Sequence, residues 1–538
     1  MASPELRALV MRLIAAGSWH EAESAAIQDT SDDSSVSVLL GLAIAAMGED
    51  ARAAPILVKA AAARLDAEHP CVDLANLKPP LPRSLVVRQF RACLRAAPSD
   101  HRLRLAFAEF LIDIGDAAEA ERTLTDAPDS AASHHLLGLA QAEQAKFAAC
   151  IDSFQHAVAL DPAAAASWSN LGMVLKVEGR FTEAIAAHDK AVTLAPANPR
   201  FRVNRAVALL KAGQWERAWL DYEARFELPG APAIDPQRLM PSLAQGDRLT
   251  GKTILALHED GFGDTLQFLR YLPLLADRGA RVIARVPPAL YRVMRAVPGV
   301  TDVVTDTRHR PAHDFVCPMF SLPRVFATTP RTIPAMPPLT LDPALLRQWA
   351  GRLPYGGLRV GLVWAGQARP SLPGFGTLDR RRSAGLAAFG PILDVQGVTF
   401  VSLQAGPAAR HPRPRGLEMF DPMPDVKDFA DTAAIIAGLD VVVSVDTSVV
   451  HLAGLVGKPV LLLDRYDGCW RWLSGRLDSP WYPAMTILRQ EQPDDWTSPM
   501  TEAAASLRAV TMFRGFAPMG ASAAATLGGG VRERAFVA

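Results

Sequence analysis

An aspartate-threonine-serine turn, Asp446 to Ser448, is the segment of this chain best suited to bind an anion. It follows a run of β-branched, apolar residues, Val441 to Val445, and precedes a short helical stretch that stops at Gly457. This pattern predicts a buried strand, a tight turn and a helix. The free N–H groups and the positive dipole end of such a helix stabilise a diphosphate, and the carboxyl ends of strands in open α/β sheets are where ligands bind.

A second candidate site lies in His258 to Thr265, where Gly261 and Gly263 follow an expected strand and precede an expected helix. Glycines at such a point allow a sharp turn and close approach of a ligand to the backbone. Two roles are open to Asp264, which follows the second glycine: N-cap of the helix, or a general base that faces a cleft. The spacing alone favours the cap. The segment is not a dinucleotide fingerprint, because the third glycine is missing.

Three consecutive arginines, Arg380, Arg381 and Arg382, follow another expected strand and small-residue turn, Val360 to Gly366. A charged run of this kind is usually a solvated surface segment. Here it is expected in a loop beyond the carboxyl end of a strand, on the side where the first anion site also opens. Because an arginine fork matches a diphosphate, we expect at least one of the three to reach it, beside the backbone of the turn.

These segments belong to a half of the chain in which strands and helices alternate, which predicts parallel sheets covered on both faces. We expect an α/β fold of two Rossmann-like lobes, residues 251–343 and 357–514, with a cleft between them. A proline-rich linker, residues 229–250, precedes them, and a flexible Gly/Ala-rich tail, residues 515–538, follows. The expected strands are 253–258, 281–285, 303–304, 315–316, 360–364, 399–403, 441–445 and 460–463, and the expected helices are 264–277, 289–297 and 430–439.

The first half of the chain shows a 34-residue repeat. Gly138 and Gly172 are 34 residues apart, as are the alanines and prolines that follow them, and this period is typical of the tetratricopeptide repeat. Such helix pairs stack into an α-solenoid, a superhelix with a concave groove, which we expect over residues 3–228. An irregular joint is expected near 74–83, where prolines exclude a helix interior. The groove suits a peptide or protein partner; the alternative is a spacer or an oligomerisation arm.

Composition narrows the classes of function. The chain has 538 residues, 49% of them hydrophobic and 21% charged, and its formal net charge is zero. It therefore lacks the basic field that would hold nucleic acid or an anionic membrane. The most apolar helical stretch, residues 36–47, is shorter than the roughly 20 residues that span a bilayer. We expect a cytoplasmic protein, at most peripheral at the inner membrane, with no nucleic-acid partner and no transmembrane segment. Five scattered cysteines indicate neither a disulfide framework nor a zinc site.

Residues 252 to about 490 resemble the glycosyltransferase family 9 group, the bacterial heptosyltransferase type with a two-lobed GT-B fold. The resemblance rests on Gly261-Phe262-Gly263-Asp264, on the strand and turn from Gly361 to Gly366, and on the segment from Asp446 to Ala453. With the repeats in front, the chain up to residue 490 resembles bacterial tetratricopeptide proteins with a glycosyltransferase-like C-terminal half.

This resemblance implies an inverting transfer of a sugar from a nucleotide-sugar donor to an acceptor hydroxyl. It gives Asp264 the role of base, and it assigns the donor to Asp446, Thr447, Ser448 and His451. Heptosyltransferases usually have glycine where this chain has Ser448, so the identity of the donor stays open. A helix N-terminus and an arginine can stabilise the leaving diphosphate, so neither a metal nor another cofactor is expected. The repeat array would dock a protein or glycan acceptor, or a partner protein.

Several assignments stay open in the sequence. Asp446 would repel phosphate, so we expect it to bind a sugar or ribose hydroxyl, with helix capping as the alternative. Arg471, between two tryptophans, is a candidate ligand contact. Four aromatic residues lie around it, and we expect most of them to cover the second lobe by packing, with stacking of one ring on a sugar or base as the alternative: Trp470, Trp472, Trp481 and Tyr482. A non-catalytic scaffold, whose GT-B half only binds a nucleotide or only folds, is the competing hypothesis.

Overall fold

The computed structural model describes residues 4–27, 34–62, 71–72, 76, 80–232, 234–306, 308, 311–368 and 375–514. The chain divides into two compact units. The first comprises Met1–Leu175 with Asp189–Ala195, and the second comprises Lys176–His188 with Pro196–Ala538. Half of the predicted joint at 74–83 and the whole predicted tail at 515–538 lie outside the described residues.

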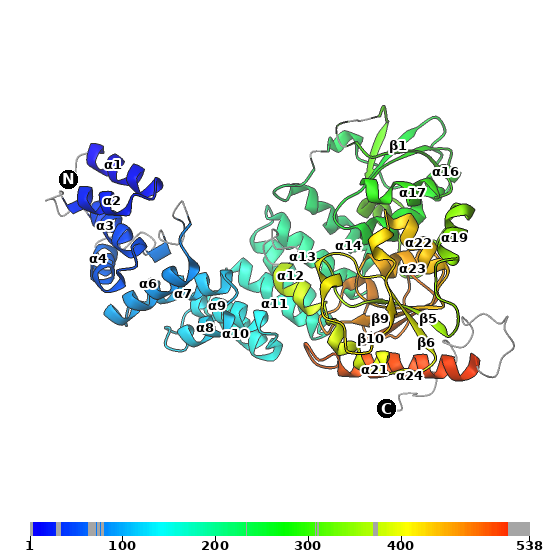
Figure 1. The fold of residues 1–538 in the computed structure, drawn as a ribbon. Coiled ribbons are helices and arrows are strands. Elements are labelled where there is room, and N and C mark those ends of the chain that lie inside the picture. Colours follow the sequence, from blue (N-terminus) through cyan, green and yellow to red (C-terminus); the bar gives the residue numbers. More distant parts are fainter. Residues whose placement is uncertain are drawn as a thin grey trace, which may run out of the picture. The chain divides into compact units, whose positions relative to one another are not determined.

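A helical array forms the N-terminal part of the chain (Figure 1). Its helices are α1 (Pro4–Ala15), α2 (Trp19–Ile27), α3 (Ser34–Ala46), α4 (Asp50–Ala62), α6 (Arg83–Ala96), α7 (His101–Asp113), α8 (Ala117–Leu124), α9 (Ala131–Glu143), α10 (Phe147–Leu160), α11 (Ala165–Val177), α12 (Phe181–Leu194), α13 (Pro199–Lys211) and α14 (Trp215–Tyr222).

The predicted 34-residue period is visible in the helix boundaries. Helices α9, α11 and α13 begin 34 residues apart, and so do α10, α12 and α14. The repeated glycine has a steric reason. A Cβ atom on Gly138 would lie 2.8 Å from the ring of Phe154, so only glycine allows α9 and α10 to pack this closely. The predicted helical repeat array is confirmed.

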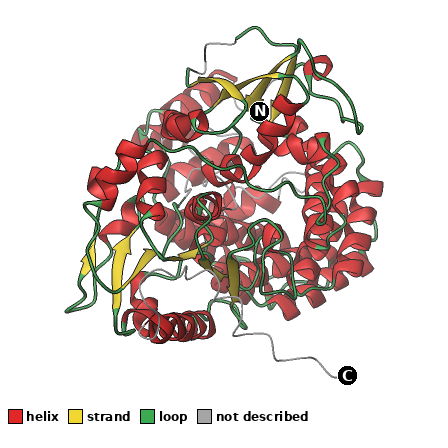
Figure 2. Ribbon diagram, turned by 90° about the vertical axis from the view of Figure 1, so that its right-hand side faces the viewer, coloured by secondary structure: helices red, strands yellow, loops and turns green. Residues whose placement is uncertain are grey.

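The first of two parallel sheets has the strand order β3-β2-β1-β4. The strands are the yellow arrows of Figure 2. Its strands are β1 (Thr253–Leu257), β2 (Arg281–Arg285), β3 (Val300–Val304) and β4 (Phe315–Pro318). The connections from β1 to β3 carry α15 (Phe262–Phe268), α16 (Leu272–Asp277) and α17 (Tyr291–Arg295). Because right-handed crossovers in one direction place their helices on one face, these helices share a face of the sheet. On the opposite face, Ile234 of the linker packs against Leu255, Leu257, Ile283 and Val316.

The second sheet has the order β10-β9-β8-β5-β6-β7, and all its strand pairs are parallel. The strands are β5 (Leu358–Val363), β6 (Val398–Ser402), β7 (Met419–Phe420), β8 (Val441–Val445), β9 (Val460–Asp464) and β10 (Met485–Arg489). One face joins a core cluster with α21 (Gly390–Leu393) and α24 (Thr497–Arg514), and the other joins a cluster with α22 (Phe429–Ala437) and α23 (Ser448–Leu455). The predicted parallel-sheet α/β part is therefore confirmed.

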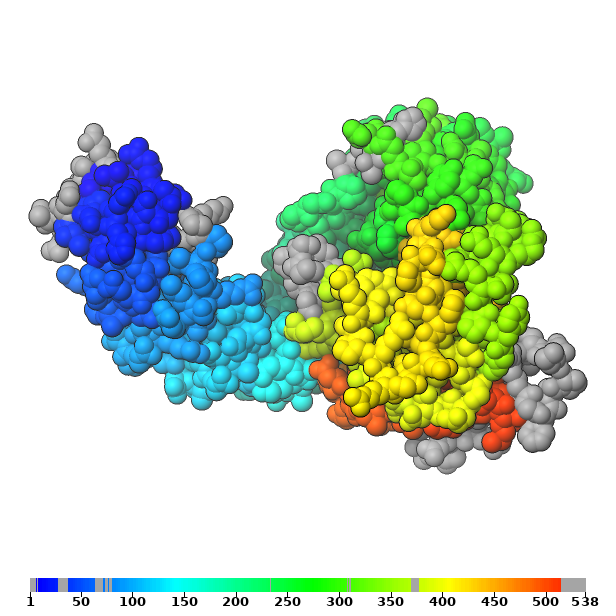
Figure 3. Space-filling view, viewed as in Figure 1, coloured from blue at the N-terminus to red at the C-terminus, as the bar shows by residue number. Residues whose placement is uncertain are grey.

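The two α/β lobes contact each other through α17 and α22. Arg292 of α17 forms ion pairs of 2.7 Å with Asp428 and Asp431 at the start of α22. In the space-filling view, the green residues of the first lobe meet the yellow residues of the second along the visible face (Figure 3). Helix α19 (Pro343–Ala350), which follows the first lobe in sequence, packs against α22 as well.

Several element predictions were wrong in detail. The helix expected at 264–277 is split, because a 3₁₀ turn at Leu269–Tyr271 separates α15 from α16. Pro273, near the start of α16, lacks the N–H that a continuous helix would need. The arginine run was expected in a loop, but Arg380 and Arg381 end a helix, α20 (Phe375–Arg381). Strands β7 and β10 and helix α24 were not predicted.

Candidate functional site

The two helices that follow the predicted motifs, α15 and α23, pack against each other. A Cβ atom on Gly263 would lie 2.8 Å from Cδ2 of His451 and 3.4 Å from Cα of Ser448. Only a residue without a side chain allows this contact. The fold thus brings the Gly-Phe-Gly-Asp motif of the first lobe next to the Asp-Thr-Ser turn of the second, although the sequence places them far apart.

Asp264 is the third residue of α15, and its carboxylate accepts a hydrogen bond from the backbone of the N-cap residue. Gly261, not Asp264, is the N-cap, and its N–H donates to Oδ2 of Asp264 over 2.9 Å. The interpretation of Asp264 as the N-cap residue was therefore wrong in position, because the helix begins at Phe262. Oδ1 accepts a hydrogen bond from the guanidinium of Arg471 in the other lobe.

The electrostatic environment of Asp264 favours the protonated acid. Burial raises the pKa of Asp264, and the nearby carboxylates of Asp260 and Asp446 act in the same direction. The Arg471 cation and the N–H of Gly261 oppose this rise in pKa but do not cancel it. A carboxylate whose pKa lies above its usual range is a better proton acceptor near neutral pH, which suits a general base.

Besides Asp264, the Arg471 guanidinium contacts several groups of the protein. Nε donates to Oε1 of Gln267 over 2.6 Å, and Nη1 lies 3.1 Å from Sγ of Cys469. Its guanidinium carbon is 4.6 Å from the ring centre of Trp470, a cation–π contact. Arg471 therefore holds α15 and Asp264 in place, and its predicted role as a direct ligand contact is replaced by a positioning role.

Thr447 is the residue that caps α23. Its Oγ1 accepts a hydrogen bond of 3.3 Å from the N–H of Val449, and Ser448 is the first helical residue. The capping alternative for Asp446 is thus wrong. Within the described part of the chain the Asp446 carboxylate has neither a hydrogen-bond partner nor an ion-pair partner, and it is partly exposed. Asp446 is available to a ligand.

His451 lies inside the protein rather than at an open surface. Its ring stacks on Trp472 with 5.5 Å between ring centres, and Nδ1 lies 2.8 Å from Oη of Tyr482. Burial lowers the pKa of His451 well below its usual value, so the ring is neutral. His451 was predicted to contact the nucleotide-sugar donor. In the structure its ring faces Gly263 of α15 and forms part of the contact between the two lobes.

The three arginines of the run point to different places. Arg380 is exposed and donates to Oγ1 of Thr377 on its own helix. Arg381 reaches the loop after β9, where Nη1 lies 3.4 Å from Oδ2 of Asp467. Two of the three arginines, Arg381 and Arg382, are therefore largely buried and are not part of a solvated surface run.

Arg382 covers the predicted turn at Gly366. Its guanidinium occupies the position that a Cβ atom on Gly366 would need. Nη2 donates to the carbonyl oxygen of Gln367 over 2.8 Å and pairs with Asp379 at 3.0 Å. A side chain at position 366 would displace the Arg382 guanidinium, so the glycine leaves room for the arginine that covers this turn.

The sequence reasoning missed a group of charged residues in the loop after β9. Arg465 pairs with Asp467 at 2.7 Å, and the Asp446 carboxylate is among the groups that raise the pKa of Arg465. From the repeat array, Lys211 donates to the carbonyl oxygens of Gly468 and Cys469, both over 3.1 Å. Burial lowers the pKa of Lys211 to about 8. A signal existed for Arg465, because it directly follows a buried strand at the same sheet edge, but none existed for Lys211.

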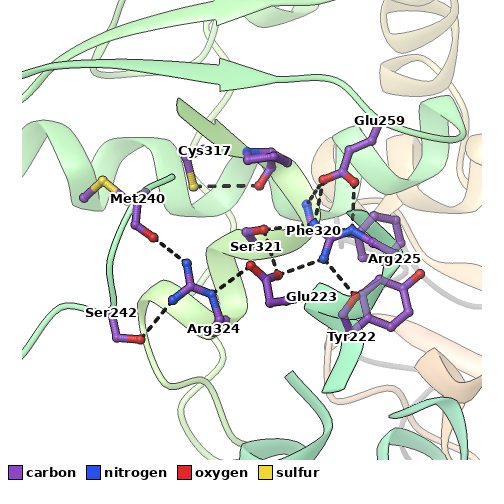
Figure 4. Close-up of polar contacts among 11 residues, drawn as sticks. Tyr222, Glu223, Arg225, Met240, Ser242, Glu259, Cys317, Phe320, Ser321 and Arg324 are labelled. Carbon is purple, nitrogen blue, oxygen red and sulfur yellow. Dashed lines mark hydrogen bonds and ion pairs between the residues drawn. The ribbon is translucent and has the colours of Figure 1, made fainter. Parts of the chain in front are cut away.

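The loop before α15 is also held by the end of the repeat array (Figure 4). Arg225 forms two hydrogen bonds with the Glu259 carboxylate, Nε to Oε1 over 2.9 Å and Nη2 to Oε2 over 3.0 Å. A third bond of 2.8 Å runs from Nη1 to Glu223. Glu259 also accepts from the N–H of Phe320 over 3.2 Å. This buried network fixes the start of the loop in which Asp260 adopts a left-handed φ of 54°.

The aromatic residues near Arg471 are packed, as predicted. The four side chains are 0 to 6% exposed. Their partners were not foreseen, because they come from α14: Trp215 stacks on Trp481 with 5.2 Å between ring centres, and Trp219 lies 5.6 Å from Trp470. Helix α14 is therefore part of the same core as the second lobe.

Comparisons with known proteins cover parts of this chain. Residues 177–218 match the tetratricopeptide repeat family. Protein FlbA of Caulobacter vibrioides is 28% identical over 344 residues, which are 56% of this chain and 54% of FlbA. The chain thus spans about half the length of this curated relative.

Two solved structures match parts of the chain. MamA is 25% identical, covers 27% of this chain and 87% of its own, and has a TM-score of 0.25. A family 9 glycosyl transferase from Veillonella parvula is 12% identical, covers 48% of this chain and 98% of its own, and has a TM-score of 0.37.

The described residues contain neither a cluster of metal ligands nor a membrane-spanning helix. No group of three or more His, Cys, Asp or Glu side chains in that part of the chain is arranged to hold a metal ion. Across the same residues, no helix combines the length and the apolar character that crossing a membrane requires.

Proposed function

We propose that the C-terminal half transfers a sugar from a nucleotide-sugar to an acceptor hydroxyl with inversion, and that the repeat array docks the acceptor or a partner protein. The observation that carries this proposal is the packing of α15 on α23, which sets Asp264 beside the turn at Asp446 and Ser448. A general base and an anion-binding helix N-terminus in one site are the two parts that such a transfer needs.

In this reaction the acceptor oxygen forms a bond to the anomeric carbon of the donor sugar. The bond from that carbon to the diphosphate breaks, and its electron pair leaves with the diphosphate. Asp264 takes the proton of the acceptor hydroxyl. The diphosphate lies at the N–H group of Ser448, the first residue of α23, where the helix dipole stabilises its charge. Asp446 accepts a hydrogen bond from a sugar or ribose hydroxyl.

A non-catalytic scaffold is the second candidate, and one observation favours it. The Asp264 carboxylate is already paired with Arg471, so a proposed catalytic group has a partner within the protein. In that case the α/β half would bind a nucleotide or support the repeats, and the array alone would carry the function of binding a partner.

A panel of nucleotides separates the two candidates. We expect one nucleoside diphosphate or nucleotide-sugar to raise the melting temperature of the full chain, because a ligand at 100 times its Kd stabilises by about 2.7 kcal/mol. Release of the nucleoside diphosphate from the matching nucleotide-sugar then reports transfer. Absence of a thermal shift with every nucleotide would contradict the transferase.

A further inference from the structure

Tyr222, the last residue of α14, lies at the candidate site although it belongs to the repeat array. Its ring centre is 5.1 Å from that of Phe320. The guanidinium carbon of Arg471 is 5.4 Å from the same phenyl ring. Tyr222 and Arg471 are therefore neighbours across Phe320, and Arg471 is the partner of Asp264.

The backbone and ring of Tyr222 are held, but its hydroxyl is not. Its carbonyl oxygen accepts a hydrogen bond of 3.2 Å from Nη1 of Arg225, whose guanidinium lies 5.1 Å from the tyrosine ring centre. In Figure 4 the hydroxyl points away from the network of Arg225 with Glu223 and Glu259. Within the described residues this hydroxyl has no hydrogen-bond partner, and the side chain is only half-buried. A fixed ring with an unused hydroxyl suits contact with a ligand.

The charges around Tyr222 define what such a ligand can be. Burial raises the pKa of Tyr222, and Asp260 and Asp264 add to the rise, so the phenol stays neutral and can donate a hydrogen bond. The carboxyl groups of Asp260 and Asp264 act on the phenol, whereas the two cations beside it, Arg225 and Arg471, are already paired with Glu259 and Asp264. This field repels an anionic acceptor group and admits an uncharged one.

We propose that Tyr222 contacts the acceptor, and that the reacting group of the acceptor is an uncharged aliphatic hydroxyl. The phenol donates to this hydroxyl while Asp264 accepts its proton. This inference rests on the proposed transferase function. It means that the last helix of the repeat array, α14, contributes a residue to the acceptor site. A glycan and a serine or threonine side chain share this chemistry.

The test removes only the hydroxyl, with Tyr222→Phe in the full chain. Transfer is followed as nucleoside diphosphate release from the donor found in the panel, with methyl glucoside or N-acetylserinamide as the acceptor. Loss of one neutral hydrogen bond predicts a roughly 3- to 10-fold rise in the acceptor KM. The thermal shift with nucleotide stays unchanged. The better acceptor of the two tells whether a glycan or a protein is the source of the hydroxyl.

Tyr271→Phe is the matched control. Its hydroxyl is buried and bonded to Thr328 over 2.9 Å, so the variant loses a hydrogen bond and some stability away from the site. Its acceptor KM stays at the wild-type value. An unchanged acceptor KM in Tyr222→Phe would overturn the inference.

A binding measurement keeps the inference separate from the proposed function. The chain has six tyrosines, so labelling with 3-fluorotyrosine gives a simple fluorine spectrum in which Tyr222→Phe identifies one resonance. We expect this resonance to shift with methyl glucoside or N-acetylserinamide and to stay in place with glucose 6-phosphate. A shift without transfer from any donor would refute only the transferase. An unmoved resonance with both neutral probes, or a larger shift with the phosphate, would refute the inference itself.

Discussion

Asp264 and Arg471 form an ion pair between the first α/β lobe and the loop that follows β9 of the second. The side chains are 18% and 12% exposed, so solvent screens the pair weakly. One residue is the proposed base and the other holds it in place. Removal of the Asp264 carboxylate therefore tests proton transfer, and removal of the Arg471 guanidinium tests how the base is held.

Asp264→Asn removes the base and leaves an isosteric side chain. We expect the transfer rate to fall by about 10²- to 10⁴-fold, the usual contribution of a general base, while the thermal shift with nucleotide persists. Asp277→Asn, at the exposed end of α16, is the control and keeps full activity. Wild-type turnover in Asp264→Asn would remove Asp264 from the base role.

Arg471→Gln removes the cation that lowers the pKa of Asp264. The pKa of Asp264 then rises further, and because only the ionised carboxylate accepts a proton, the acidic limb of the pH–rate profile moves to higher pH. Arg471→Lys retains a positive charge and gives a smaller displacement. Breaking a buried pair also costs about 3 kcal/mol in the free energy of unfolding, which urea titration measures. Identical pH profiles in all three proteins would contradict the pairing.

Gly263→Ala tests the contact between α15 and α23. The added methyl group meets the ring of His451 at 2.8 Å, so we expect a loss of about 1–3 kcal/mol in the free energy of unfolding. Gly390→Ala is the control, because nothing lies within 4 Å of its Cβ position. A second change, His451→Ala, should restore part of the loss in a double-mutant cycle. Additive losses would show that the two residues do not touch.

His188→Leu removes a buried polar ring. Both ring nitrogens of His188 lack a hydrogen-bond partner in the described structure, and burial lowers its pKa to about 3. The folded protein therefore keeps a neutral ring at a pH where the unfolded chain takes up a proton. The contribution of His188 to the free energy of unfolding is therefore complete above about pH 6.5. It falls by about 1.4 kcal/mol per pH unit as the pH drops from there towards 3.

Urea titrations at pH 7.5 and pH 5 measure this effect. We expect His188→Leu to unfold at higher urea than the wild type at both values, and to lose less stability on acidification. His20→Gln, at an exposed position of α2, leaves both values unchanged. If the wild type and His188→Leu lose the same stability between the two pH values, His188 does not titrate on unfolding.

The features that local sequence controls were predictable. The 34-residue spacing predicted the period of the helix pairs in the array, and the β-branched run at Val441 to Val445 predicted β8 without error. The capping of α15 was placed wrongly, because glycine at an N-cap gives no side-chain signal and the acidic partner three residues later was taken for the cap.

Contacts between distant segments were not predictable. Lys211, Tyr222 and Arg225 come from the repeat array, and no local pattern indicates that they reach the loops of the α/β half. The same holds for the pairing of Asp264 with Arg471. A tryptophan cluster could be recognised as packing, but its partners on α14 depend on how the chain folds back.

The bonds between Arg225 and Glu259 set a limit on how such proteins can be recombined. Duplication or loss of a 34-residue piece upstream of residue 176 leaves both partners in place, so the number of repeats is free to vary in evolution. A crossover between residues 225 and 259 would instead join an arginine of one parent to a carboxylate of another. A working chimaera therefore takes α13, α14 and the α/β half from the same parent.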